Sequence, residues 1–76
     1  MTSACMLIRT EPGKFAKVAD NLDQIIEVKR VFPVIGRFDV VVDLEATDPK
    51  SLGKSVMKVN RLAGVVYTET LVEVEG

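Results

Sequence analysis

The sequence has no histidine and no tryptophan, and it has only one cysteine and one tyrosine in 76 residues. The absence of histidine excludes histidine-based catalytic triads and most zinc sites, because imidazole is the base in the former and a ligand in the latter. The lone Cys5 cannot form a disulfide within the chain, and we expect it to be a small core residue. We therefore expect no metal site and no bound cofactor.

An excess of charge of one sign and long hydrophobic runs are also lacking. The formal net charge is -1, so no basic excess attracts nucleic acid or an acidic membrane surface. No apolar stretch approaches the roughly 20 residues that cross a bilayer, and residues 1–8 lack the pattern of a secretory signal. We expect a cytoplasmic protein that neither enters a membrane nor binds DNA directly.

The sequence is rich in aliphatic residues for its length. A chain of 76 residues has room for one domain, and 47% of its residues are hydrophobic although only 5% are aromatic. A lone domain of this size cannot easily bury so much aliphatic surface. We therefore expect a single domain over residues 1–76 that associates with copies of itself.

Hydrophobic patterning predicts three elements in the first half of the chain. Residues 4–8 form a continuous apolar run, which is typical of a central strand covered on both faces. After a turn at residues 10–13, apolar residues at helical spacing predict a helix whose buried stripe is Phe15, Val18, Ala19 and Leu22. Residues 28–35 predict a second strand, and Pro33 favours a sheet edge because proline donates no ladder hydrogen bond.

Three further elements are predicted after the turn at Gly36. Residues 38–44 alternate as a third strand, and Asp48 followed by proline is a helix start. This helix should end at Gly64 and bury Leu52, Val56, Val59 and Ala63. Residues 65–74 predict the last strand.

The order of these elements, β-α-β-β-α-β, predicts an α+β fold of the ferredoxin-like kind, with a four-stranded antiparallel sheet and two helices on one face. The opposite face, which carries either Met6 or Cys5 and Leu7, would remain apolar in a monomer. A second copy is the simplest cover, so we predict a homodimer that packs through this face.

Several short motifs resemble, in their order and spacing, the ligand-binding (RAM) domain of the Lrp/AsnC regulators. They are Gly36-Arg37-Phe38-Asp39 between two strands, the acidic residue Asp48 at the second helix, and Leu62-Ala63-Gly64-Val65 before the last strand. The resemblance covers nearly the whole chain. It implies a stand-alone form without the helix-turn-helix that most members carry.

The resemblance also implies a function in transcriptional regulation of amino-acid metabolism. Dimers would assemble into rings of four or five dimers, an octamer or a decamer, and full-length Lrp/AsnC regulators are possible partners. Amino-acid effectors would bind between dimers. Carried over residue by residue, the effector site comprises Gly36, Arg37, Phe38, Asp39, Thr68, Thr70, Leu71 and Val72.

The chemistry of the turn is compatible with an amino-acid zwitterion, which needs donors for its carboxylate and an acceptor for its ammonium group. The Gly36 N–H and the Arg37 guanidinium are donors, and the Asp39 carboxylate is an acceptor. Simpler roles compete with this one. Asp39 would equally serve to tie down its own turn, Arg37 is first an exposed turn residue, and Phe38 is expected in the core.

Two alternatives remain open from the sequence. The first is a small dimeric α/β-barrel enzyme, a cofactor-independent oxygenase or isomerase, which the absence of histidine and the scarcity of inward polar residues disfavour. We expect no enzyme. The second concerns a basic stripe on the second predicted helix, which is a solvated face or a docking site for an acidic partner or DNA phosphate; it comprises Lys50, Lys54, Lys58 and Arg61.

Overall fold

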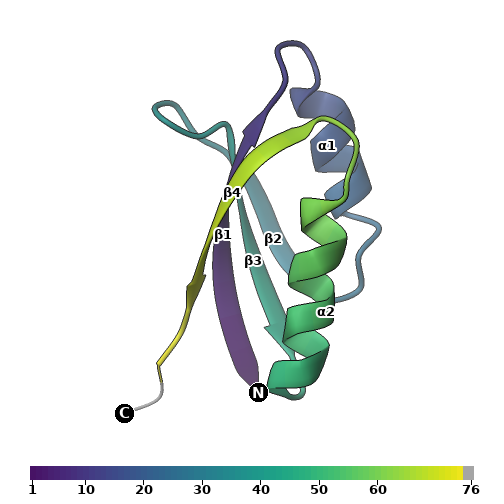
Figure 1. Ribbon diagram of the computed structural model, residues 1–76, viewed down its shortest axis with the longest axis vertical. Coiled ribbons are helices and arrows are strands. Elements are labelled where there is room, and N and C mark those ends of the chain that lie inside the picture. Colours follow the sequence, from purple (N-terminus) through teal and green to yellow (C-terminus); the bar gives the residue numbers. More distant parts are fainter. Residues whose placement is uncertain (75–76) are drawn as a thin grey trace.

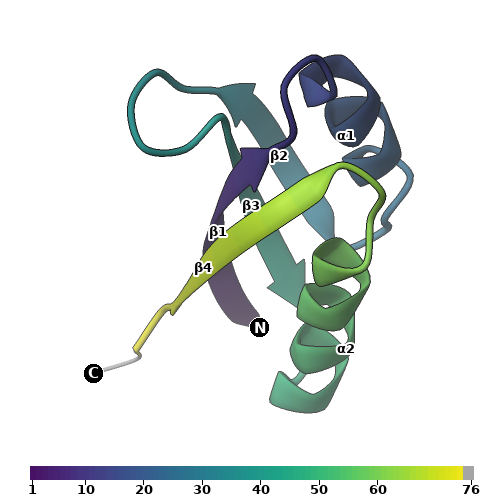
Figure 2. The same cartoon turned by 45° about the horizontal axis from the view of Figure 1, so that its top comes forward.

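A computed structural model describes residues 1–74, in which one sheet carries two helices (Figure 1). The elements in chain order are β1 (Thr2–Thr10), α1 (Phe15–Leu22), β2 (Val28–Pro33), β3 (Val40–Ala46), α2 (Pro49–Asn60) and β4 (Val65–Val72). Both helices lie on the same face of the sheet, and Figure 2 shows the other face uncovered. The ferredoxin-like prediction is confirmed; the last two residues of the predicted domain 1–76 lie outside the described part.

The four strands are antiparallel and are arranged in the order β2-β3-β1-β4. The first and third strands are therefore central, and β2 is an edge strand, as Pro33 predicted. Most alternate residues of β1 and β3 point toward the helices and are buried there, and the helices contribute four more buried hydrophobic side chains. Full burial of each large aliphatic side chain stabilises the fold by about 1.5–3 kcal/mol. This core includes Met6, Ile8, Val40, Val42, Leu44, Val18, Leu22, Leu52 and Val59.

The strands on either side of Gly36 end and begin farther from it than predicted. β2 ends at Pro33 and β3 begins at Val40, so residues 34–39 form a loop. Gly36 has a φ of +141°, a conformation that side chains rarely adopt, and the strand pattern cannot continue through it. The prediction that Phe38 lies in the core is wrong, because its half-buried ring lies in this loop and stacks on Tyr67.

The ends of the other elements also differ from the prediction. Phe15, the first residue of α1, is exposed because no strand lies beneath that end of the helix stripe. The helix α2 ends at Asn60 instead of continuing to Gly64, so Ala63 lies outside it and is exposed. The buried side of α2 also contains Ser55. Its hydroxyl donates a hydrogen bond of 3.1 Å to the carbonyl oxygen of Ser51. The strand β4 ends at Val72, two residues early.

The predicted start of α2 is confirmed. The Oδ1 atom of Asp48 accepts a hydrogen bond from the backbone N–H of Ser51 at 2.8 Å, and Pro49 occupies the first helical position. This backbone hydrogen bond is the main reason that the pKa of Asp48 lies below 3.8. The exposed carboxylate therefore stabilises the helix in its charged form.

Gly64 is expected to tolerate no side chain. Its φ is +94°, and an added Cβ would lie 3.0 Å from a Val18 methyl group and 3.1 Å from the Lys14 Cβ. Gly64→Ala should lower the free energy of unfolding by about 2 kcal/mol or more, measured by urea denaturation. Gly53→Ala is the matched control, because Gly53 is helical with open space around it. That variant should gain about 0.5–1 kcal/mol; equal effects of the two changes would contradict the argument.

The cap at Asp48 is expected to make stability depend on pH. Because its pKa in the folded state lies below 3.8, its contribution is present above that value and is lost as the pH falls through the folded-state pKa. The difference in urea midpoint between the wild type and Asp48→Ala should therefore be full at about pH 6 and shrink below pH 3.8. A difference that does not change with pH would show that the carboxylate charge has no part in capping.

Candidate functional site

The loop of residues 34–39, hereafter the turn, is closed by backbone hydrogen bonds. The N–H of Val34 donates to the carbonyl oxygen of Asp39 at 3.0 Å, and the N–H of Asp39 donates to the carbonyl oxygen of Ile8 at 2.8 Å. The second bond joins the turn to the central strand β1. An added Cβ at Gly36 would meet no atom within 4 Å, so the backbone there is open to a ligand.

The Asp39 carboxylate binds a neighbouring strand and not its own turn. Its Oδ2 atom accepts from the backbone N–H of Thr10 at 2.8 Å and lies 3.4 Å from the Thr10 hydroxyl. Thr10 is the last residue of β1, where the pairing with β4 shifts register. Within residues 1–74 no hydrogen bond reaches Oδ1 of Asp39. One carboxylate oxygen is thus structural, and the other is available.

Two further contacts hold the turn, and sequence reasoning missed the residues that make them. The Arg9 guanidinium donates from Nε at 3.0 Å and from Nη2 at 2.7 Å to the carbonyl oxygen of Arg37. The Phe38 ring stacks on Tyr67 with 6.2 Å between ring centroids and 18° between planes. Arg9 and Tyr67 are opposite each other in the β1–β4 pairing. Knowledge of this strand register would have placed both Arg9 and Tyr67 beside the turn.

The predicted site residues on β4 do not join the turn within one chain. Thr68, Thr70 and Val72 alternate with Leu71, so the first three point to the helix face and Leu71 to the open face. The Thr68 hydroxyl donates to the side-chain oxygen of Asn60 at 2.6 Å, which ties β4 to the end of α2. The strand runs away from the turn after Tyr67. The structure therefore brings residues 36–39 together and leaves the β4 residues as a second group.

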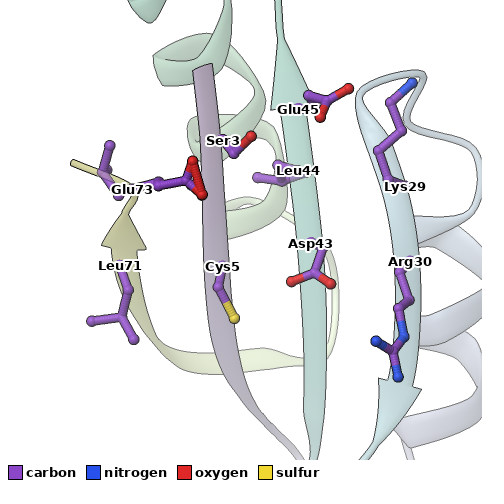
Figure 3. A pocket seen from close by; sticks show the side chains of 11 residues that line it. Ser3, Cys5, Lys29, Arg30, Asp43, Leu44, Glu45, Leu71 and Glu73 are labelled. Atoms are coloured by element: carbon purple, nitrogen blue, oxygen red, sulfur yellow. The ribbon is translucent and has the colours of Figure 1, made fainter. Parts of the chain in front are cut away.

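The open face of the sheet has a shallow hollow of about 650 Å³ (Figure 3). One row of opposed residues crosses it, formed by Arg30, Asp43, Cys5 and Leu71 on β2, β3, β1 and β4. Burial, and then the negative charge of Asp43, raise the pKa of the Cys5 thiol. Cys5 is therefore a poor nucleophile, because the thiolate is disfavoured.

The next row on this face is mainly apolar. It contains Phe32, Val41 and Leu7, followed by Glu69 on β4. Tyr67 and Leu71 add large apolar groups that are 53% and 58% exposed. These side chains form an apolar strip that includes residues of all four strands, with Val41 buried in its centre and Leu7 and Phe32 partly exposed, and such a patch is typical of an interaction site.

The two edges of the open face differ in charge, and Asp43 and Glu45 add acidic groups on β3 between them. Lys29 and Arg30 lie on β2, and the Arg30 guanidinium is 4.3 Å from the centroid of the Phe32 ring. Glu69 and Glu73 lie on β4 or directly after it and are exposed. Figure 3 shows the basic side chains and Glu73 on opposite sides of the hollow. One edge is basic and the other acidic.

Other types of site receive no support from the described residues. Residues 1–74 contain no cluster of acidic or cysteine side chains that is suited to a metal ion. In the same range, no helix is long and apolar enough to span a membrane. The basic stripe of Lys50, Lys54, Lys58 and Arg61 is exposed along α2 and just beyond it.

Comparison with known sequences gives a match to the family model of the Lrp/AsnC ligand binding domain over residues 3–75. The HTH-type transcriptional regulator FL11 of Pyrococcus abyssi is 30% identical over 69 residues, which are 91% of this chain and 46% of that protein. The protein of the same name in Pyrococcus horikoshii is 28% identical over the same share of both chains. This chain thus spans about half the length of the curated relatives that it matches.

Solved structures with the same fold include proteins that are matched over nearly their whole length. FFRP-DM1 is 28% identical with a TM-score of 0.93, and the match covers 97% of this chain and 100% of that one. The hypothetical protein PHS023 from Pyrococcus horikoshii is 27% identical with a TM-score of 0.91, covering 100% and 93%. AsnC of E. coli, at 14% identity, shares the fold with a TM-score of 0.89 over 99% of this chain and 52% of its own. The fold, the family match and the relationship to transcriptional regulators agree, and this chain belongs to the Lrp/AsnC ligand-binding domain family.

Proposed function

We propose that this chain is an amino-acid-binding and oligomerisation module of transcriptional regulation, which acts in the cytoplasm, catalyses no reaction and makes no direct contact with DNA. The observation that carries the proposal is the Asp39 carboxylate, which is fixed through Oδ2 to Thr10 and keeps Oδ1 free of hydrogen bonds within residues 1–74. A fixed acceptor with one free oxygen suits an ammonium group. The relationship to proteins named transcriptional regulators supports the regulatory role.

The remaining groups of the turn complement the other parts of an amino acid. Gly36 is exposed with open space where a Cβ would lie, and Arg37 is exposed, so a carboxylate can approach both residues. The stacked rings of Phe38 and Tyr67 form a flat apolar wall beside them. The proposed site also includes four residues of β4 from a neighbouring copy, because within one chain these residues lie away from the turn. They are Thr68, Thr70, Leu71 and Val72.

The apolar strip on the open face supports a homodimer. A second copy that packs on this face would cover the partly exposed Leu7 and Phe32 and remove Leu71 from water. Apolar area buried between sheets is the main driving force of such association.

The distribution of charge selects one orientation of this dimer. A twofold axis that lies in the interface and is perpendicular to the strands would place each strand over its own copy in the reverse direction, so that the basic edge faces the basic edge and the acidic edge faces the acidic edge. A twofold axis parallel to the strands places β2 of one copy against β4 of the other, so basic and acidic edges meet. We therefore assign the axis parallel to the strands.

Higher assembly is part of the same proposal. The turn lies at one end of the sheet, outside the open face, and Ile35 in it is fully exposed. Such a position leaves the turn available for contacts between dimers. We propose that dimers join there into an octamer or a decamer, alone or together with full-length Lrp/AsnC regulators, with the effector at the contact.

The two roles of Asp39 are separable by substitution. Asp39→Asn keeps an oxygen that accepts from the Thr10 N–H but removes the charge that an ammonium group requires. In a thermal-shift screen of single amino acids, the wild type should be stabilised by one or a few of them, and Asp39→Asn should stay folded without responding. Asp39→Ala should also lose about 1–3 kcal/mol of stability, because the Thr10 N–H loses its partner.

Asp43→Asn is the matched control for this screen, because Asp43 is a partly exposed acid on the open face, away from the turn. It should respond to amino acids as the wild type does. An unchanged response of Asp39→Asn, or a wild type that no amino acid stabilises, would refute amino-acid binding at the turn.

The dimer is tested by placing a charge in the apolar strip. Leu7→Glu should convert the protein into a monomer at micromolar concentration, as measured by light scattering after size exclusion, because a carboxylate would be buried without a partner. Met57→Glu is the control, since Met57 is exposed on α2 and not on the open face. If the wild type is itself monomeric at this concentration, the dimer does not form.

A further inference from the structure

Arg9 holds the turn with only part of its guanidinium group. Its Nε and Nη2 atoms both donate to the carbonyl oxygen of Arg37, at 3.0 Å and 2.7 Å. Its Nη1 atom makes no hydrogen bond within residues 1–74, and the side chain is exposed. The outer edge of the guanidinium, formed by Nη1 and the second N–H of Nη2, is therefore available to another acceptor.

The Asp39 carboxylate belongs to the same short segment of paired chain. Asp39 contacts the residues on either side of Arg9, because its N–H donates to the carbonyl oxygen of Ile8 at 2.8 Å and its Oδ2 accepts from the N–H of Thr10 at 2.8 Å. In the described part of the chain the two charged groups do not hydrogen-bond to each other. The turn thus presents a free acceptor, Asp39 Oδ1, and a free donor edge on Arg9.

An α-amino acid carries its ammonium group and its carboxylate on one carbon atom, so its site requires an acceptor and a donor that lie near each other. The outer edge of a guanidinium group matches a carboxylate, because its parallel N–H groups bond both oxygens at once. Resting on the amino-acid site proposed above, we propose that Arg9 binds the carboxylate of the effector while Asp39 binds its ammonium group.

Arg9 is better prepared for this role than Arg37. The head group of Arg9 is already held by two hydrogen bonds, so little side-chain freedom remains to be lost when a ligand binds. Arg37 contributes its backbone carbonyl oxygen to this contact, and its own side chain is exposed. Holding a free arginine side chain in one conformation costs conformational entropy. Arg9 therefore provides the main contact with the carboxylate, and Arg37 adds less.

Two aromatic rings lie beside Arg9. Tyr67 is opposite Arg9 in the β1–β4 pairing, so both side chains leave the same face of the sheet, and the Tyr67 ring stacks on Phe38. The ring pair limits the access of water to one side of the guanidinium group. Charge-assisted hydrogen bonds are stronger where water is scarce, which favours binding of a carboxylate at this position.

The test compares an amino acid with its carboxamide, in which a neutral amide replaces the carboxylate. The amino acid is the one that stabilises the wild type most in the thermal-shift screen, and both dissociation constants are measured by titration calorimetry. The wild type should bind the amino acid about tenfold or more tightly than the carboxamide. Arg9→Gln keeps an N–H donor for the Arg37 carbonyl oxygen but lacks the charge and the outer edge, so it should bind both ligands within about threefold of each other.

Arg61→Gln is the matched control, because Arg61 is an exposed arginine directly after α2, on the helix side of the molecule. It should keep the wild-type preference for the amino acid. Arg37→Gln should reduce this preference by less than Arg9→Gln does. If Arg9→Gln does not fold, Arg9→Lys replaces it; lysine keeps the charge but donates from a single point, so the preference should fall by about threefold or more.

The outcomes distinguish this role from a structural one and from failure of the site. If Arg9 only holds the turn, its substitution weakens both ligands equally and leaves their ratio unchanged, which would overturn the role of Arg9 while amino-acid binding stands. A wild type that binds both ligands equally, or a preference that is lost in Arg37→Gln and kept in Arg9→Gln, would also overturn it. A wild type that binds no amino acid would refute the effector site itself.

Discussion

A sheet has two faces, and this chain has only two short helices with which to cover them. Both lie on one face, so most residues of β1 and β3 that point to the helices are hydrophobic and buried. The residues that point the other way are mixed, with an apolar strip, two acidic residues on β3 and opposite charges at the two edges. This one-sided cover sets the rest of the structure, because it directs every candidate interaction to surfaces that another chain must complete.

The turn at residues 34–39 is rigidly coupled to that sheet. It is joined to β1 by the Asp39 contact with Thr10 and by the Arg9 contact with the Arg37 carbonyl oxygen, and to β4 by the stacking of Phe38 on Tyr67. A ligand that engages the turn thus acts on the ends of two strands that also form the open face. In the proposed assembly, occupancy of the turn by an effector and association of the chains would be linked, since each would affect the free energy of the other.

Much of the fold could be predicted because the signals were local. Periodicity gave the order of elements, Pro33 placed β2 at an edge, and Asp48 marked the start of α2 through a bond to Ser51 three residues away. The site was harder, because its decisive bond joins Asp39 to Thr10, which is 29 residues distant in sequence. Phe38 was misplaced because the third strand was predicted to begin at residue 38, whereas the loop extends to Asp39 and β3 begins at Val40.

The separation of charge on the open face also bears on which chains can assemble with one another. Apolar strips on two related domains would associate with little discrimination, since hydrophobic contact is not directional. Attraction between opposite edges of two copies favours one orientation of the dimer. The basic edge carries Lys29 and Arg30, and the acidic edge carries Glu69 and Glu73. With relatives about 30% identical, most surface positions differ. A partner that keeps this division of charge would pair with this chain, and one that reverses a single edge would meet like charge.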